Sequence, residues 1–182
     1  MILPIVQYGH PVLRERCKPV EEVTEEIRTL AADMLETMYD ANGVGLAAPQ
    51  IGVALRLAVI DVAHDPECIS FLKVNGEDAA LESIMPLIFI NPELELVGEK
   101  ERDTEGCLSI RDMRAEVTRP NAVKATLPQF DGSVLVIETD GLLARALQHE
   151  TDHLNGVLFI DRLSPATKLS IKRKLRRLAA EG

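Results

Sequence analysis

Residues 148–156 read Gln-His-Glu-Thr-Asp-His-Leu-Asn-Gly, with two histidines four positions apart and a glutamate directly after the first. The run from about Gly141 to Leu154 favours a helix, which a stop at 155–156 would end. Residues four apart lie on one side of a helix, so His149 and His153 can bind one metal ion with Glu150 beside it. This stretch predicts the metal-binding helix of a metal-assisted hydrolase.

The side of this helix that carries the histidines is otherwise apolar. The predicted stripe consists of Leu142, Ala146, His149 and His153, whereas Arg145 and Asp152 point elsewhere. Inward histidines without a metal would be buried polar groups in need of other partners. The alternative is a chance occurrence of a short pattern, but two of only four histidines in the chain fall at this spacing, which favours a metal site.

Length and composition indicate one domain, residues 1–182, large enough to bury about 70% of the surface that its unfolded chain exposes. A net charge of −9 argues against DNA as a partner. The N-terminus lacks a basic start and a long apolar stretch, so we expect no secretory signal and no membrane span. Three cysteines without tight spacing favour a reducing, cytoplasmic location.

The C-terminal segment differs in charge from the rest of the chain. Residues 164–182 contain six basic residues and one acidic residue, a net charge of +5, which leaves −14 for the remainder. A helix is predicted from Leu163 to Ala180, with Ile171, Leu175 and Leu178 on one side. It is interpreted either as a solvated helix packed on a sheet or as a basic extension that docks on RNA.

The remaining pattern predicts an α+β fold. A helix follows the N-cap Thr24, and strands are predicted at 55–61 and 87–90. A hairpin of 122–130 and 133–139 turns at Asp131-Gly132. Residues 64–86 read as a solvated excursion between strands. We therefore expect a β-rich single domain of mostly antiparallel strands around a central metal-binding helix, with N-terminal and C-terminal helices.

Two further segments carry candidate chemistry. Cys107 stands in Glu-Gly-Cys-Leu-Ser, residues 105–109, where Gly106 permits close backbone approach; an inert core thiol is the alternative reading. Cys17 and Cys68 lie in a charged stretch and in the excursion, and we expect neither to be a ligand. Residues 43–50 are rich in glycine and alanine and end in the carboxamide of Gln50, a pattern that also serves packing.

Together these segments resemble the peptide deformylase family. The chain reads G-x-G-x-A-A-x-Q at 43–50, E-G-C-L-S at 105–109 and Q-H-E-x-D-H-L-x-G at 148–156, in that order. The opening Gly-His-Pro-Val-Leu-Arg at 9–14 fits as well, so the resemblance runs from the N-terminus to about Arg162.

The resemblance implies hydrolysis of the N-formyl group from the formylmethionine of new polypeptides, which releases formate. The implied metal ligands are Cys107, His149 and His153, with water in the fourth position. Fe(II) is the implied native metal, and zinc, nickel or cobalt would suit the same ligands. Metal-bound hydroxide would attack, while Glu150 would serve as general base and then acid. The side chain of Gln50 and the backbone N–H of Leu108 would stabilise the oxyanion.

The same resemblance suggests how substrate is bound. The expected substrate-binding residues are Val44, Gly45, Gly106, Leu142, Ala146 and Arg145. Many relatives carry an aliphatic residue at position 145, so the charge of Arg145 is expected to leave the pocket mouth or to extend along it. Glu105 would support the ligands by orienting His149 or by pairing with Arg119, although a surface carboxylate is the alternative.

The expected partners are formyl-methionyl nascent polypeptides and, through the basic helix, the ribosome. Two other functions remain open from the sequence. One is a different H-E-x-x-H metallohydrolase such as a peptidase, whose third ligand would follow the helix. The other is a non-enzymatic module with a structural metal and an RNA-binding tail, which a fourth protein ligand would support.

Overall fold

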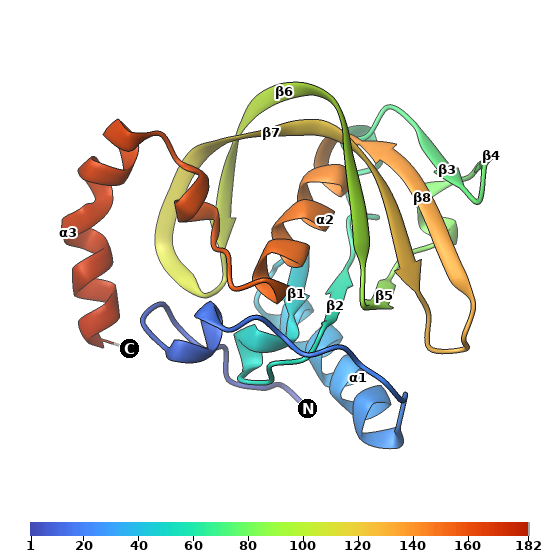
Figure 1. The fold of residues 1–182 in the computed structure, drawn as a ribbon, viewed down its shortest axis with the longest axis horizontal. Coiled ribbons are helices and arrows are strands. Elements are labelled where there is room, and N and C mark those ends of the chain that lie inside the picture. Colours follow the sequence, from blue (N-terminus) through green and yellow to red (C-terminus); the bar gives the residue numbers. More distant parts are fainter. Residues whose placement is uncertain (182) are drawn as a thin grey trace.

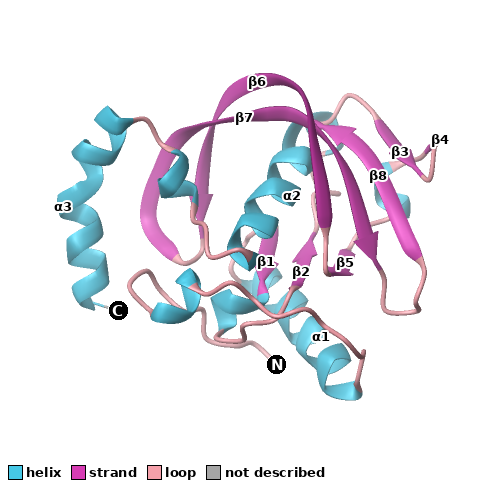
Figure 2. Ribbon diagram, viewed as in Figure 1, coloured by secondary structure: helices cyan, strands magenta, loops and turns pink. Residues whose placement is uncertain are grey.

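Two antiparallel sheets enclose one central helix, α2 (Gly141–Leu154), in this computed structural model, which describes residues 1–181 (Figure 1). Gly182, the last residue of the expected domain and of its basic extension, lies outside the described residues. Figure 2 shows the long strands arching over α2 while the remaining helices lie outside. The expected α+β architecture around a central helix is confirmed.

The smaller sheet has the strand order β1-β2-β5. Its strands are β1 (Gly45–Ala47), β2 (Leu57–Ile60) and β5 (Leu87–Ile90). The helix α1 (Glu25–Asp40) packs on it through buried Ala31, Met34 and Met38. Thr24 caps α1 by accepting a hydrogen bond from the Ile27 N–H, as its position before the helix predicts. The helix and the two strands expected in this region are confirmed.

The larger sheet has the order β4-β3-β8-β7-β6. Its strands are β3 (Leu72–Val74), β4 (Glu77–Asp78), β6 (Glu93–Cys107), β7 (Ile110–Pro128) and β8 (Val134–Asp140). The register of β7 and β8 runs from the Ala122–Asp140 pair to the Pro128–Val134 pair. The hairpin expected around residues 131–132 is therefore confirmed.

The excursion expected at 64–86 is not a simple solvated loop. It contributes β3 and β4, and β3 pairs with β8 to extend the larger sheet. Leu72 and Leu81 are each 5% exposed because they pack into the main core. The β3–β4 turn uses Asn75 and Gly76, both at positive φ, as a two-residue hairpin requires.

The long hairpin of β6 and β7 was not predicted beyond residues 122–130. Most residues of β6 are exposed, and after residue 97 its sequence is largely charged, so it lacks the sustained alternation that marks a half-buried strand. Pairing with β7 along almost its whole length forms the strand instead. The hairpin brings Cys107, at the end of β6, back beneath α2.

The α2 helix begins after β8 and is buried on several sides. Leu143, Ala144 and Leu147 are fully buried in the main core, in addition to the predicted histidine stripe. Gly141 has φ of +57°, and a Cβ there would lie 1.9 Å from the carbonyl oxygen of Cys68. The start of α2 thus depends on a residue without a side chain.

The C-terminal helix α3 (Pro165–Glu181) lies at one end of the molecule, beside the turn between β6 and β7 (Figure 1). Leu178 is buried, and Ile171 and Leu175 pack against a second apolar cluster. The chain's predicted helix is thus confirmed, with its apolar side covered. None of the helices formed by residues 1–181 combines the length and the apolar character that crossing a membrane requires.

Candidate metal centre and active site

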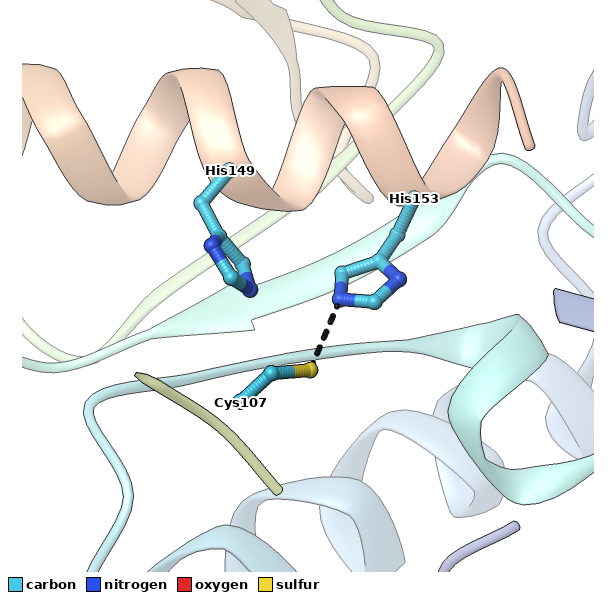
Figure 3. A group of neighbouring side chains, drawn as sticks. All are labelled: Cys107, His149 and His153. Carbon is cyan, nitrogen blue, oxygen red and sulfur yellow. Dashed lines mark hydrogen bonds between the residues drawn. The ribbon is translucent and has the colours of Figure 1, made fainter. Parts of the chain in front are cut away.

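Three predicted ligands from two distant segments meet beneath α2. Cys107 ends β6, and His149 and His153 descend from successive turns of α2 toward it (Figure 3). One ligand atom from each residue lies within 4.8 Å of the others, and Cys107 Sγ is 3.4 Å from His153 Nε2. The H-E-x-x-H spacing therefore places both histidines on one side of the helix, as predicted.

These residues fit a divalent transition metal. Two imidazoles and a thiolate form a donor set that zinc and iron(II) accept. Burial lowers the pKa of His153 well below its usual value, and the charges of His149 and Arg119 lower it further. The neutral imidazole is the form that ligates a metal. No fourth His, Cys, Asp or Glu within residues 1–181 joins the group, which leaves a position for solvent or substrate.

Glu105 holds the ring of one predicted ligand, His149, in place. Its Oε1 lies 3.0 Å from His149 Nδ1, so that ring presents Nε2 to the ligand group. Arg119 donates two hydrogen bonds to Glu105, 2.6 Å from Nε to Oε2 and 2.9 Å from Nη2 to Oε1. Burial alone would raise the pKa of Glu105, but the bonds from His149 and Arg119 hold it far below the usual range. Glu105 is 6% exposed, so it is not a surface carboxylate.

Of the two directions expected for Arg145, the structure shows the one in which its charge leaves the pocket mouth. It is 8% exposed, and its guanidinium donates to Glu105 Oε2 at 2.7 Å and to the carbonyl oxygens of Val117 and Glu101. The buried carboxylate attracts the guanidinium into the wall. Glu105 and Arg145 were both singled out in the sequence, but nothing in it indicates that they are close in space.

Glu150 is the buried carboxylate beside the ligands. It is 3% exposed, and its Oε1 has no hydrogen-bond partner within residues 1–181. Burial raises the pKa of Glu150 to about 7. Gly45 makes room for it, since a Cβ on Gly45 would lie 2.4 Å from Glu150 Oε2. The glycine-rich segment therefore leaves the space that the Glu150 side chain of α2 occupies.

Gln50 is held with its amide toward the ligands. Its Oε1 accepts a hydrogen bond from the Ala47 N–H at 3.0 Å. Its Nε2 donates to Ser109 Oγ at 3.1 Å and approaches Cys107 Sγ at 3.5 Å. The Leu108 carbonyl accepts a hydrogen bond from Gln7 Nε2 at 3.0 Å, which holds the peptide after Leu108. The carboxamide of Gln50 is thus positioned at one edge of the ligand group.

A cavity of about 860 Å³ opens onto these groups. Its walls include Val44, Gly45, Gly106, Leu142, Arg145 and Ala146, the residues expected to bind substrate. Leu108, Gln50, Cys107, His149 and Glu150 also line it, whereas His153 and Arg119 lie behind the wall. The volume is in the range of small-molecule sites.

Several residues of the site were missed from the sequence. Asp152 bonds both Arg119 and Arg162, and Ser109 accepts from Gln50. Both stand inside the quoted motifs, so their position beside the ligands was the available signal. Asp103, Thr104 and residues 110–114, which also line the cavity, gave no sequence signal.

The fold and the ligand geometry define a metal-dependent hydrolase of the H-E-x-x-H class. A sequence model described as polypeptide deformylase matches residues 2–169. The peptide deformylase of Agrobacterium fabrum is 46% identical over 179 residues, 98% of this chain and 96% of its own length. That of Mesorhizobium japonicum is 45% identical over 181 residues, 99% of this chain and 94% of its own. The chain belongs to the polypeptide deformylase family.

Solved structures agree with this assignment. The peptide deformylase of Legionella pneumophila aligns with a TM-score of 0.80 at 40% identity, over 100% of this chain and 99% of that one. That of Synechococcus elongatus, in complex with actinonin, gives a TM-score of 0.79 at 38% identity, over 94% and 85% of the two chains. The protein is therefore a hydrolase that removes N-formyl groups from formylmethionyl polypeptides, and the rival peptidase and structural-module interpretations are set aside.

Proposed function

We propose that Cys107, His149 and His153 hold the catalytic metal and that Glu150 transfers the protons of deformylation. The observation that carries this proposal is the placement of Glu150, a buried carboxylate with an unpartnered oxygen, in the lining of the cavity that Cys107 and His149 also line. A divalent metal bound there would lower the pKa of water to roughly 7 and so supply the hydrolytic nucleophile.

The residues around the ligands would then have separate roles in the reaction. Glu150 accepts the proton released from water and delivers it to the departing amine, without which an amide nitrogen is a poor leaving group. Negative charge develops on the formyl oxygen as the nucleophile adds. The Gln50 amide and the Leu108 N–H donate to that oxygen, and loss of one such donor costs about 3 to 4 kcal/mol. Glu105 and Arg119 act as positioning residues by holding the ring of His149.

Substrate would enter the large cavity as an extended peptide. The methionine side chain contacts the apolar wall formed by Leu142, Ala146 and Val44. Because β1 is the edge strand of the smaller sheet, its free side can pair with the peptide backbone by β-augmentation. Backbone pairing tolerates many side chains, so residues beyond the methionine should matter little. In the wall, Gly106 allows close backbone approach, and Arg145 is a positioning residue for Glu105.

Formate release from formyl-Met-Ala tests the proposed roles. Glu150→Gln keeps the size of the side chain, and we expect a loss of kcat of at least about 100-fold with the metal content unchanged. Glu82→Gln, at an exposed position outside the cavity, serves as the matched control and should leave the rate unchanged. Full activity in Glu150→Gln would contradict the proton-transfer role, and loss of metal from it would point to a structural defect instead.

We further propose Fe(II) as the native metal, from the family resemblance and because a thiolate with two imidazoles suits it. The same ligands would bind zinc, nickel or cobalt in isolated protein. Elemental analysis of protein prepared without oxygen should find iron, and exposure to air should lower both iron content and activity. Zinc in anaerobic protein, with activity stable in air, would contradict this proposal.

The basic face of α3 supports a proposal of ribosome docking in the cytoplasm, where formylated chains are made. The exposed basic residues are Lys168, Lys172, Arg173, Arg176 and Arg177. Their replacement by Gln should weaken salt-dependent ribosome binding while activity on formyl-Met-Ala is unchanged. Exchange of the two lysines for Arg keeps the charge and is the control. Equal binding by both variants would refute the docking role.

A further inference from the structure

A second hollow, of about 580 Å³, lies on a face of α2 different from the one that carries the metal ligands. Helix residues Gln148, Thr151 and Asp152 form its floor. The start of β6, the middle of β7 and the segment before residue 20 form the walls. The hollow is in the size range of small-molecule sites, and Arg119 is the one residue with a proposed role in deformylation that lines it.

Four arginines line this hollow, and two of them are satisfied. Both oxygens of Asp152 are occupied, because Arg162 contacts Oδ2 at 2.6 Å and Oδ1 at 2.7 Å while Arg119 contacts Oδ2 at 2.9 Å. Arg119 also pairs with Glu105. Asp152 is therefore neutralised by these two arginines, and Glu93, exposed at the start of β6, is the other carboxylate of the lining.

The other two, Arg16 and Arg56, carry charge that is not balanced. Arg16 makes no hydrogen bond or ion pair with any residue of the described chain. Arg56 uses only Nη1, which donates to the Leu154 carbonyl at 3.0 Å and to Asn155 Oδ1 at 2.9 Å. Burial lowers the pKa of Arg56, and the neighbouring charge of Arg16 lowers it further. Two guanidiniums that repel each other in a chain of net charge −9 favour an anionic ligand.

The rest of the hollow restricts the class of anion. Pro19, Pro92 and Leu94 supply apolar surface to its lining. Four arginines against the two carboxylates Asp152 and Glu93 leave the lining with a net charge of +2, which matches a dianion better than a single carboxylate, and the guanidinium fork fits phosphate oxygens.

We propose that this hollow is a binding site for small phosphate monoesters. The phosphate lies between Arg16 and Arg56, and an organic group of the size of a nucleoside packs on the prolines and Leu94. The site is separate from the cavity that receives the formyl peptide, so its occupancy does not depend on the proposed catalytic roles.

Calorimetric titration of the metal-loaded protein tests the site with adenosine monophosphate, inorganic phosphate and adenosine as probes. We expect the monophosphate to bind more tightly than phosphate, and adenosine to bind at least about 10-fold more weakly, because it lacks the charge-assisted hydrogen bonds. Arg16→Gln and Arg56→Gln should each weaken monophosphate binding by about 10-fold or more. Arg16 makes no internal contact, so its variant should fold normally and release formate at the unaltered rate.

Arg102→Gln is the matched control, since Arg102 is an exposed arginine outside the hollow, paired only with Glu116 at 3.7 Å. It should leave binding unchanged. Equal weakening by Arg102→Gln would show general electrostatic attraction and overturn the proposal. Equal affinity for phosphate and the monophosphate would show an adventitious ion only. Binding that survives both substitutions in the hollow would place the ligand elsewhere and overturn it as well.

Discussion

At the scale of single residues, Gly45 determines where Glu150 can lie. A methyl group on Gly45 would stand 2.4 Å from Glu150 Oε2 and 2.8 Å from its Cδ, so the carboxylate must move. Displacement of a catalytic group by about 1 Å can cost about 100-fold in rate. We expect Gly45→Ala to lower kcat/KM for formyl-Met-Ala by that factor with the metal retained.

The control for this prediction is the same change in a variant without the carboxylate. In Glu150→Ala the clash is absent, so adding Gly45→Ala should have little further effect on melting temperature or metal content. If melting temperature or metal content falls further in the double variant, Gly45 acts through another contact.

Glu105 is the second residue whose replacement separates the possible roles. Glu105→Gln leaves Arg119 and Arg145 buried without their shared counter-charge, and breaking a buried pair costs about 3 to 5 kcal/mol. The ring of His149 also loses its support, so metal affinity should fall by about 10- to 100-fold. Chemical denaturation and metal titration measure the two effects. Glu101→Gln, an exposed carboxylate on the same strand, should change neither.

Arg145 shows which features of a single residue the sequence predicts and which it does not. Its place on the wall of the large cavity was expected from the family resemblance and not from helical spacing, which was taken to point it away from the histidine stripe. The direction of its guanidinium could not be predicted, because Glu105 reaches it only through the long β6–β7 hairpin. Ligand spacing within one helix is local, whereas contacts between helix and hairpin depend on the whole fold.

At the scale of elements, the segments with a local sequence pattern were predicted, whereas strands that depend on a distant partner were not. The α1 and α2 helices and the β5 strand carry their own periodicity and end signals, and they were predicted with nearly the observed bounds. By contrast, β6 is exposed and charged, and β3 is only three residues long. Both become strands because a partner offers hydrogen bonds, and a partner distant in sequence leaves no local pattern.

The β3–β4 turn permits a test of this dependence on pairing. Gly76 has φ of +87° with nothing within 4 Å of an added Cβ, so Gly76→Ala introduces backbone strain without a clash. The left-handed region costs a side-chain-bearing residue about 1 to 2 kcal/mol. For a chain of this size each kcal/mol lowers the melting temperature by about 2 to 4 °C. Gly76→Asn, which tolerates positive φ, should lose less, and equal losses would refute this cause.

At the scale of the whole molecule, the ligand set joins the end of the long hairpin to the central helix. Cys107 belongs to the larger sheet and the histidines to α2, so a metal held by these proposed ligands would fix the two parts of the fold together. A ligand that binds only the folded state stabilises it by mass action. The metal should therefore contribute to the stability of the entire chain as well as to its chemistry.

Chelation under anaerobic conditions is expected to lower the melting temperature by about 10 °C, because saturation at 100 to 1,000 times Kd is worth about 3 to 4 kcal/mol. It should also expose the thiol of Cys107, which lines the substrate cavity, to iodoacetamide at pH 8. Cys17 is the internal control, since burial raises the pKa of its thiol to about 11 and keeps it unreactive in both states. Mass spectrometry of the modified peptides distinguishes the two. Equal labelling of Cys107 with and without metal, together with an unchanged melting temperature, would show that this thiol is not a ligand.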